Sequence, residues 1–250
     1  MSDSKIYALD FDGVICDSAV ETGITGWKVA HQIWQEMPAQ TPAEMIALFR
    51  QVRPVMETGY EAILIMRLLF EGVTVQSLLD DFSTVIAMIL NREKLAIDQL
   101  KKKFGETRDH WISKDLKHWI AMNPLFEGIA NKLRLLNPEQ CVIITTKQER
   151  FVSHILNANN ISLSPERIFG LDRKLSKAQV LYNLLNMHPR STLLFIEDRL
   201  PTLVDVINDH RLNDVELFFA TWGYNTQQDK QAASALRPIT CLNLEQMLAL

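Results

Sequence analysis

The stretch that decides the fold is Lys5-Ile6-Tyr7-Ala8-Leu9-Asp10-Phe11-Asp12-Gly13-Val14-Ile15, near the start of the chain. Its apolar run gives way to acids and then a glycine, which predicts a buried strand whose C-terminal end delivers side chains into a crevice. Asp10 and Asp12 are two residues apart, so a strand would place both carboxylates on one face. A divalent cation or a proton would relieve their repulsion, and Gly13 would let backbone amides point at an anion. The alternative interpretation is a strand end followed by an Asp-rich turn.

Length and composition limit the classes of protein that the chain can represent. With 250 residues it exceeds a typical single domain, so one large or two modest domains are expected. The net charge of −4 gives no basic footprint for nucleic acid or for an anionic membrane. We therefore expect small molecules or proteins as partners, while any oligomeric state is compatible with these properties.

The cysteines and the apolar segments indicate the cellular compartment of the protein. Cys16, Cys141 and Cys241 show neither CxxC nor metal-finger spacing, which predicts free thiols in a reducing compartment. The sequence opens without the pattern of a signal peptide, because acids interrupt its first apolar run. The longest apolar stretch elsewhere, 62–70, contains Arg67 and is too short to span a bilayer. A cytoplasmic protein is expected.

Residues 18–122 have the periodicity of helices rather than strands, with apolar residues at three- and four-residue steps divided by prolines and glycines into five or six segments. So much helix after one strand is unusual within an open sheet, so we predict a separate helical domain. Residues 1–17 and 123–250 would then form the other domain. Within the helical domain, we interpret Lys101-Lys102-Lys103 as a solvated helix face, or otherwise a substrate-facing patch. Its histidines are interpreted as surface or core residues rather than metal ligands.

After residue 123 the pattern alternates between buried strands and amphipathic helices. Strands are predicted at 141–144, 168–170, 192–196 and 215–220. This alternation predicts an α/β fold with a doubly wound parallel sheet, in which ligands bind beyond the C-terminal ends of the strands. Asp10, Asp12, Thr145 and Asp198 all fall at such ends.

These residue types suit phosphoryl transfer, which needs a nucleophile, neutralisation of oxygen charge and a proton donor. Asp10 and Asp12 supply carboxylates that can act as a nucleophile or as a general acid and base. Thr145 offers a hydroxyl to a phosphate oxygen, and Gly13 and Thr146 are further candidates for binding the substrate. Lys177 follows a predicted N-cap at Ser176, and the helix dipole disfavours a cation there, which hints at a functional reason. Lys174, three residues earlier, is the alternative candidate for the role of this lysine.

The segments Asp10–Ile15, Cys141–Lys147, Leu175–Leu181 and Glu197-Asp198 resemble, in order, the four motifs of the haloacid dehalogenase superfamily in its phosphatase branch. The resemblance implies a Rossmann-like core, an aspartyl-phosphate formed on Asp10, Asp12 as acid and base, and Mg²⁺ as cofactor. The helical insert after the first motif resembles the C1-type cap of phosphoglycolate phosphatases and β-phosphoglucomutases. Trp222-Gly223-Tyr224-Asn225 also resembles the former group.

The fourth motif departs from the family pattern, which has Gly-Asp or Ser-Asp and a second acid four residues later. Here Glu197 precedes Asp198, and the later position is Thr202. We expect Mg²⁺ to be held by Asp10, Asp198 and the Asp12 backbone carbonyl. Glu197 either supplies the missing charge, through a water or through Lys177, or is a salt-bridge partner of Lys177 or Arg199. Asp205 is a weaker candidate for the missing acid.

The expected function is that of a Mg²⁺-dependent phosphatase acting on a small phosphorylated metabolite, with neither nucleic acid nor membrane as partner. One alternative is a hexose-phosphate mutase of the same family. Another is a catalytically weak member that binds a phospho-ligand or a protein. A dehalogenase is disfavoured, because that chemistry does not use the second aspartate.

Overall fold

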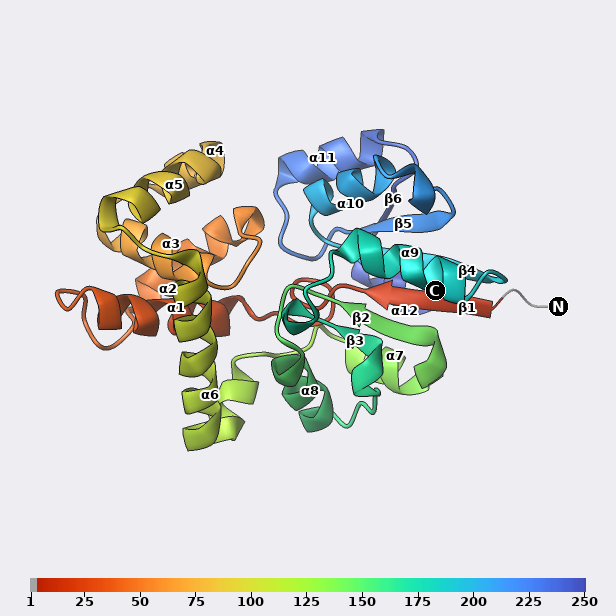
Figure 1. Ribbon diagram of the computed structural model, residues 1–250, viewed down its shortest axis with the longest axis horizontal. Helices are drawn as coiled ribbons and strands as arrows, with labels where there is room; N and C mark the ends of the chain where they lie inside the picture. The colour runs from red at the N-terminus through yellow and green to blue at the C-terminus, as the bar shows by residue number, and fades with distance from the viewer. Residues whose placement is uncertain (1–3) are drawn as a thin grey trace. The chain divides into compact units, whose positions relative to one another are not determined.

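The computed structural model describes residues 4–250, which divide into two compact units (Figure 1). One unit comprises the chain up to Asp17 together with Pro124–Leu250, and the other comprises Ser18–Asn123. Among residues 4–250, no helix combines the length and the apolar character that crossing a membrane requires.

The first unit is built on a parallel sheet of six strands in the order β3-β2-β1-β4-β5-β6. Its strands are β1 (Ser4–Leu9), β2 (Cys141–Ile144), β3 (Ile168–Phe169), β4 (Ser191–Glu197), β5 (Val215–Ala220) and β6 (Thr240–Leu242). The predicted α/β fold with a doubly wound parallel sheet is confirmed. Sequence reasoning missed β6, because a strand of three residues beside a proline has too little apolar pattern to detect.

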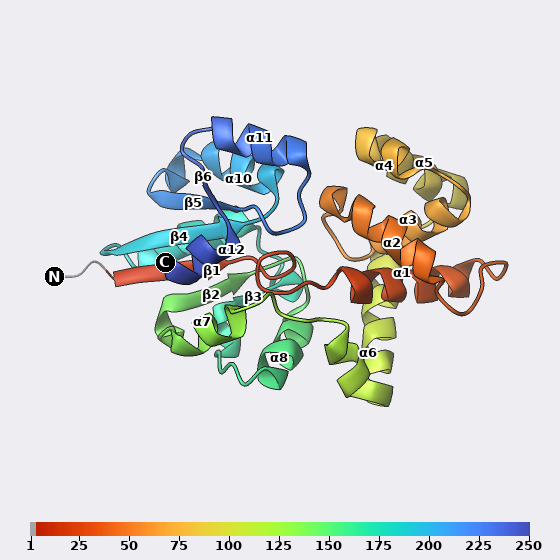
Figure 2. The same cartoon turned by 180° about the vertical axis from the view of Figure 1, so that it is seen from behind.

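Helices cover both faces of this sheet (Figures 1 and 2). They are α7 (Ile129–Leu135), α8 (Glu149–Ala158), α9 (Lys177–Met187), α10 (Leu200–Ile207), α11 (Gln227–Ala235) and α12 (Leu244–Ala249). On one face, α9, α10 and α11 pack in a buried cluster with Ala8, Phe195 and Phe219. On the other face, the Tyr7 hydroxyl donates to the Leu250 carbonyl next to α12. Burial on both faces explains why the central strands are almost wholly apolar.

The second unit is all-helical. It contains α1 (Ala19–Ile33), α2 (Ala43–Val52), α3 (Glu61–Phe70), α4 (Val75–Asp80), α5 (Phe82–Glu93) and α6 (Ile97–Ala121). Its apolar core includes the fully buried Trp27, Phe49 and Ile63. A Cβ on Gly26 would lie 2.7 Å from the Ala62 backbone, so a glycine is what lets α1 approach α3 so closely.

A buried polar cluster joins α1 to α6 within this unit. The carboxylate of Glu21 accepts hydrogen bonds from Arg108 at 2.8 and 2.6 Å and from the Trp119 indole at 3.1 Å. Glu21 is fully buried, and these charge-assisted bonds compensate for its loss of hydration. The α6 helix is kinked at Asp115, whose φ and ψ of −155° and 82° are not helical.

Candidate active site

Three buried carboxylates meet where β1 and β4 end. Asp10 directly follows β1, and its N–H donates to the Ile196 carbonyl at 2.9 Å, which continues the pairing with β4. Glu197 closes β4 and Asp198 follows it. One carboxylate oxygen from each of the three acids lies within 4.8 Å of the others, and all three side chains are buried. We call this group the acidic cluster.

Lys177 joins two members of the acidic cluster. Its Nζ donates to Asp10 Oδ1 and to Glu197 Oε2, both at 2.6 Å. Lys177 is the first residue of α9, and Ser176 caps that helix in a capping box, as the sequence predicted for this N-cap. The rival Lys174 is exposed and makes no ion pair with Asp10. The two carboxylates therefore offset the unfavourable position of Lys177 in the helix dipole.

Burial and neighbouring charges shift the pKa values of Asp10 and Lys177. Burial raises the pKa of Asp10 to about 7, with Lys177 opposing the rise and Glu197 adding to it. Burial alone would lower the pKa of Lys177, but the carboxylates of Asp10 and Glu197 outweigh it and hold the pKa above its usual value. Perturbed groups of this kind are typical of catalytic sites, although structural ion pairs produce them too.

Glu197 contacts Lys177, which was one of the alternatives that the sequence left open. Its other oxygen, Oε1, accepts the backbone N–H groups of Asp198 at 3.2 Å and of Arg199 at 3.0 Å. The carboxylate thus orients Lys177 and also the turn that carries Asp198. Thr202 and Asp205 lie one and two turns into α10, and the exposed Asp205 is outside the acidic cluster.

Two glycines let the chain close around Asp198. Its Oδ2 accepts the backbone N–H of Tyr224 at 2.6 Å. A Cβ on Gly13, whose φ is +98°, would lie 2.0 Å from that oxygen. A Cβ on Gly223 would lie 2.3 Å from the Asp198 Cβ. Sequence reasoning gave the segment 222–225 no role, and a glycine between aromatic residues just after a strand was the available signal.

Asp12 does not lie on β1, so the expectation that one strand face carries both aspartates is wrong. The strand ends at Leu9, and Asp12 forms an isolated bridge with Cys16 in the following turn. Its Oδ1 accepts from Lys147 Nζ at 2.9 Å, and its carboxylate is not part of the acidic cluster. Repulsion between Asp10 and Asp12 is thereby reduced, because each carboxylate pairs with a lysine of its own.

Lys147 is the residue of this site that sequence reasoning missed. Its side chain is fully buried, although lysine is rarely buried without a charged partner. It lies two residues beyond Thr145, whose Oγ1 accepts the Lys147 N–H at 3.1 Å and whose own N–H donates to Phe169 of β3 at 2.9 Å. Thr145 is buried and Thr146 half-buried. A lysine three residues after the end of a strand was the available signal.

Comparison with known proteins finds no matching family model and no matching curated relative. Solved structures do match over almost the whole chain. A predicted phosphatase from Clostridium acetobutylicum is 15% identical with a TM-score of 0.60, over 99% of this chain and 98% of that one. A haloacid dehalogenase-like family hydrolase from Streptococcus pneumoniae is 17% identical with a TM-score of 0.54, over 100% and 99%. A predicted phosphoglycolate phosphatase from Haemophilus somnus is 16% identical with a TM-score of 0.57, over 92% of each chain.

The chain has the fold of the haloacid dehalogenase-like hydrolases. At these identities the likeness concerns architecture, and the activity has to be argued from the side chains themselves. The haloacid dehalogenase-like fold accounts for the parallel sheet and for the position of the acidic cluster beyond its C-terminal edge.

Mg²⁺, which the sequence resemblance implies for this fold, is compatible with the acidic cluster. Three buried carboxylates offer hard oxygen ligands, and the single ammonium of Lys177 cannot neutralise all of them. Asp10 and Asp198 are the residues that would hold the ion, since Glu197 already uses both oxygens in hydrogen bonds. The donor set therefore fits the cofactor.

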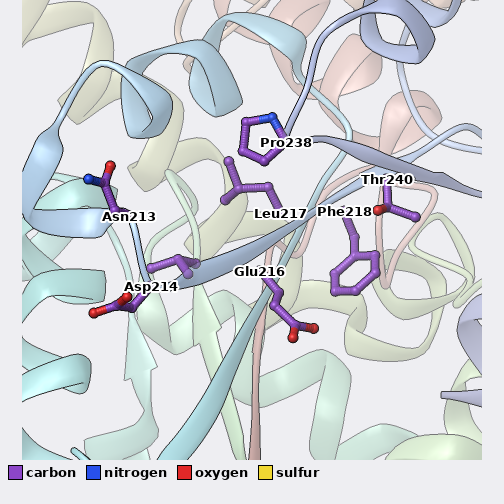
Figure 3. A pocket seen from close by; sticks show the side chains of 8 residues that line it. Asn213, Asp214, Glu216, Leu217, Phe218, Pro238 and Thr240 are labelled. Carbon is purple, nitrogen blue, oxygen red and sulfur yellow. The ribbon is translucent and has the colours of Figure 1, made fainter.

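A separate pocket lies at the other end of the sheet (Figure 3). It has a volume of about 270 Å³ and is lined by residues at the start of β5 and near β6, including Asn213, Glu216, Pro238 and Thr240. Most of its residues precede β5 and β6 or lie in the first half of those strands, whereas the acidic cluster lies at the strand ends. We assign it no part in the chemistry of the acidic cluster.

Proposed function

We propose that the chain is a Mg²⁺-dependent phosphoric monoester hydrolase that acts on a small phosphorylated metabolite through an aspartyl-phosphate on Asp10. The observation that carries the proposal is the contact of Lys177 with both Asp10 and Glu197 at 2.6 Å, beside Asp198. A buried nucleophile flanked by an ammonium and further acids is the arrangement that phosphoryl transfer by a carboxylate requires.

Each step of the reaction has a residue to perform it. An oxygen of Asp10 attacks phosphorus while the bond between phosphorus and the leaving oxygen breaks, and Asp12 donates a proton to that oxygen. A water then attacks the phosphorus and gives a proton to Asp12, which releases inorganic phosphate and restores Asp10. Lys177 and the Thr145 hydroxyl would bind the phosphoryl oxygens, where charge accumulates in the transition state. When bound, Mg²⁺ would supply further positive charge for those oxygens.

Lys147 and Glu197 would act by orienting other groups. Lys147 holds the Asp12 carboxylate at 2.9 Å, and Glu197 holds the Lys177 ammonium at 2.6 Å. Such supporting contacts keep reacting groups within the narrow geometry that fast transfer needs.

The test is hydrolysis of an aryl phosphate with and without Mg²⁺, followed by a panel of phosphorylated metabolites with detection of free phosphate. Wild-type protein should release phosphate, and Asp10→Asn should not. Formation of an isomeric sugar phosphate without phosphate release would support the mutase instead. Absence of turnover on the whole panel, with saturable binding of a phosphorylated ligand, would support the weak binding member.

A further inference from the structure

The helical unit carries a basic pocket that the proposed hydrolase chemistry does not use. It has a volume of about 290 Å³ and lies between α1 and α6, so we call it the α1–α6 pocket. The residues that matter for its chemistry are Lys28, His31, Gln32, His110, Trp111 and Lys114. A neighbouring hollow of about 180 Å³ shares Gln32, Thr107 and His110 with it and adds Lys103 and Glu106.

Helical spacing gathers these side chains. Lys28, His31 and Gln32 stand at positions i, i+3 and i+4 of α1, so they share one side of that helix. On α6, Lys114 stands four residues after His110 and three after Trp111, so it lies one turn from both. Two helices thus bring basic and polar groups to one concave surface, whereas sequence reasoning interpreted the histidines only as surface or core residues.

The α1–α6 pocket is lined by basic and neutral residues, and the acid of the neighbouring hollow, Glu106, pairs with Lys102 at 3.8 Å. Neither Lys28 nor Lys114 forms an ion pair with any residue in the range 4–250. Glu21 is the carboxylate that acts on Lys28, but Arg108 already binds both of its oxygens. A solvated helix face more commonly mixes both signs of charge.

Lys28 is half-buried and lies over an aromatic ring of the pocket. Its Nζ lies 3.4 Å from the centroid of the Trp111 ring, and the Trp111 Nε1 is held in turn by a 3.1 Å hydrogen bond to His118 Nδ1. Burial lowers the pKa of Lys28, Glu21 opposes that effect, and the charge of Lys114 adds to it. Keeping two like charges on one concave surface is unfavourable, and an anion between them would relieve the repulsion.

Neutral groups beside the lysines can add hydrogen bonds. His31 Nδ1 donates to the Met37 carbonyl at 2.7 Å, which leaves Nε2 for a ligand. The ring of His110 has no hydrogen-bond partner in the described part of the chain, and Gln32 contributes an amide.

We propose that the α1–α6 pocket binds the phosphate or carboxylate group of a small anionic molecule, between the ammonium groups of Lys28 and Lys114. Its volume accommodates such a group with a modest organic part. The binding is independent of the proposed hydrolase, since none of these residues belongs to the acidic cluster.

Inorganic phosphate is the probe for this site, added to the full chain at constant ionic strength. The indole N–H signal of Trp111 in an NMR spectrum, assigned through Trp111→Phe, should shift with saturation. Lys28→Met and Lys114→Met should each weaken this binding by about tenfold, the factor for one charge-assisted hydrogen bond. Lys117→Met is the matched control, because it removes the same charge from an exposed site on the same helix and should leave the affinity unchanged.

The indole of Trp222 serves as an internal reference for the other site. It donates to the Val14 carbonyl at 3.1 Å, next to Gly13, so it reports phosphate bound at the acidic cluster. A shift of Trp222 without Trp111 would overturn the proposal and leave the hydrolase intact. Equal affinity in Lys114→Met and Lys117→Met would also overturn it. Lys114 is exposed, so its variant should fold even where Lys28→Met does not, and thermal unfolding checks this.

Discussion

Lys147 Nζ lies 2.9 Å from Asp12 Oδ1, with the lysine side chain fully buried and the aspartate side chain 16% exposed. The buried ammonium follows β2, while the carboxylate lies in the turn after β1, so the contact fixes one strand end against the other. In the proposed mechanism Asp12 handles both proton transfers, which makes Lys147 a positioning residue for them.

Lys147→Met should lower kcat by about 10²-fold, the scale for displacing a reacting group by about 1 Å. Lys147→Arg should recover part of the loss, because it restores a cation beside Asp12. The measurement is kcat and KM for an aryl phosphate, with a thermal melt to confirm folding. A raised KM with unchanged kcat would instead assign Lys147 to substrate binding.

Asp12→Asn should lower kcat by about 10²- to 10⁴-fold, the usual scale for losing a general acid or base. Binding of substrate should persist, because the amide keeps the volume of the carboxylate. Substrate affinity is measured by equilibrium titration and turnover by phosphate release. An unchanged rate would remove Asp12 from the mechanism.

Asp10→Asn should abolish turnover while the fold is retained. An amide is a poor nucleophile, but Lys177 keeps its 2.6 Å contact with Glu197 and so is not left buried without a carboxylate. Phosphate release and the unfolding midpoint are measured together. Loss of the folded state, rather than of activity, would give Asp10 a structural role.

The departure at the fourth motif is tested by comparing Asp198→Asn with Glu197→Gln. Asp198→Asn should raise the Mg²⁺ concentration needed for half-maximal activity by more than tenfold, because it removes a ligand charge. Glu197→Gln should raise it less, since its carboxylate acts through Lys177 and two backbone N–H groups. Activity is titrated against Mg²⁺ for both variants and for the wild-type protein. A Mg²⁺ dependence equal to that of the wild type in both variants would contradict metal binding at this motif.

Thiol labelling of the native protein tests the three cysteines. Burial raises the pKa of Cys141 to about 12, so almost none of it is thiolate at pH 8, and Cys16 is fully buried. Cys241 is partly exposed, although burial raises its pKa as well. An aromatic disulfide reagent should label at most one thiol in the folded state and three in denaturant. Rapid labelling of more than one native thiol would contradict this burial.

The amino-acid sequence by itself determined five of the six strands and their order along the chain. The central strands are buried on both faces, so they consist of continuous apolar runs that can be recognised in the sequence. Helix periodicity likewise marked the insert, and a local capping box fixed Lys177 in the first turn of α9. The ends of parallel strands share one edge, which is why Asp10, Thr145 and Asp198 could be placed there in advance.

Only the tertiary structure decided which charged groups touch. Lys147 and Asp12 are 135 positions apart, and Lys177 and Asp10 are 167 apart, so neither pair leaves a local pattern. Hydrophobic periodicity records which face of an element is buried, but it carries no information about which side chain on a distant loop meets it. The contact of Glu197 with Lys177 and the basic pocket between α1 and α6 both depend on which distant side chains meet, and only the tertiary structure shows this.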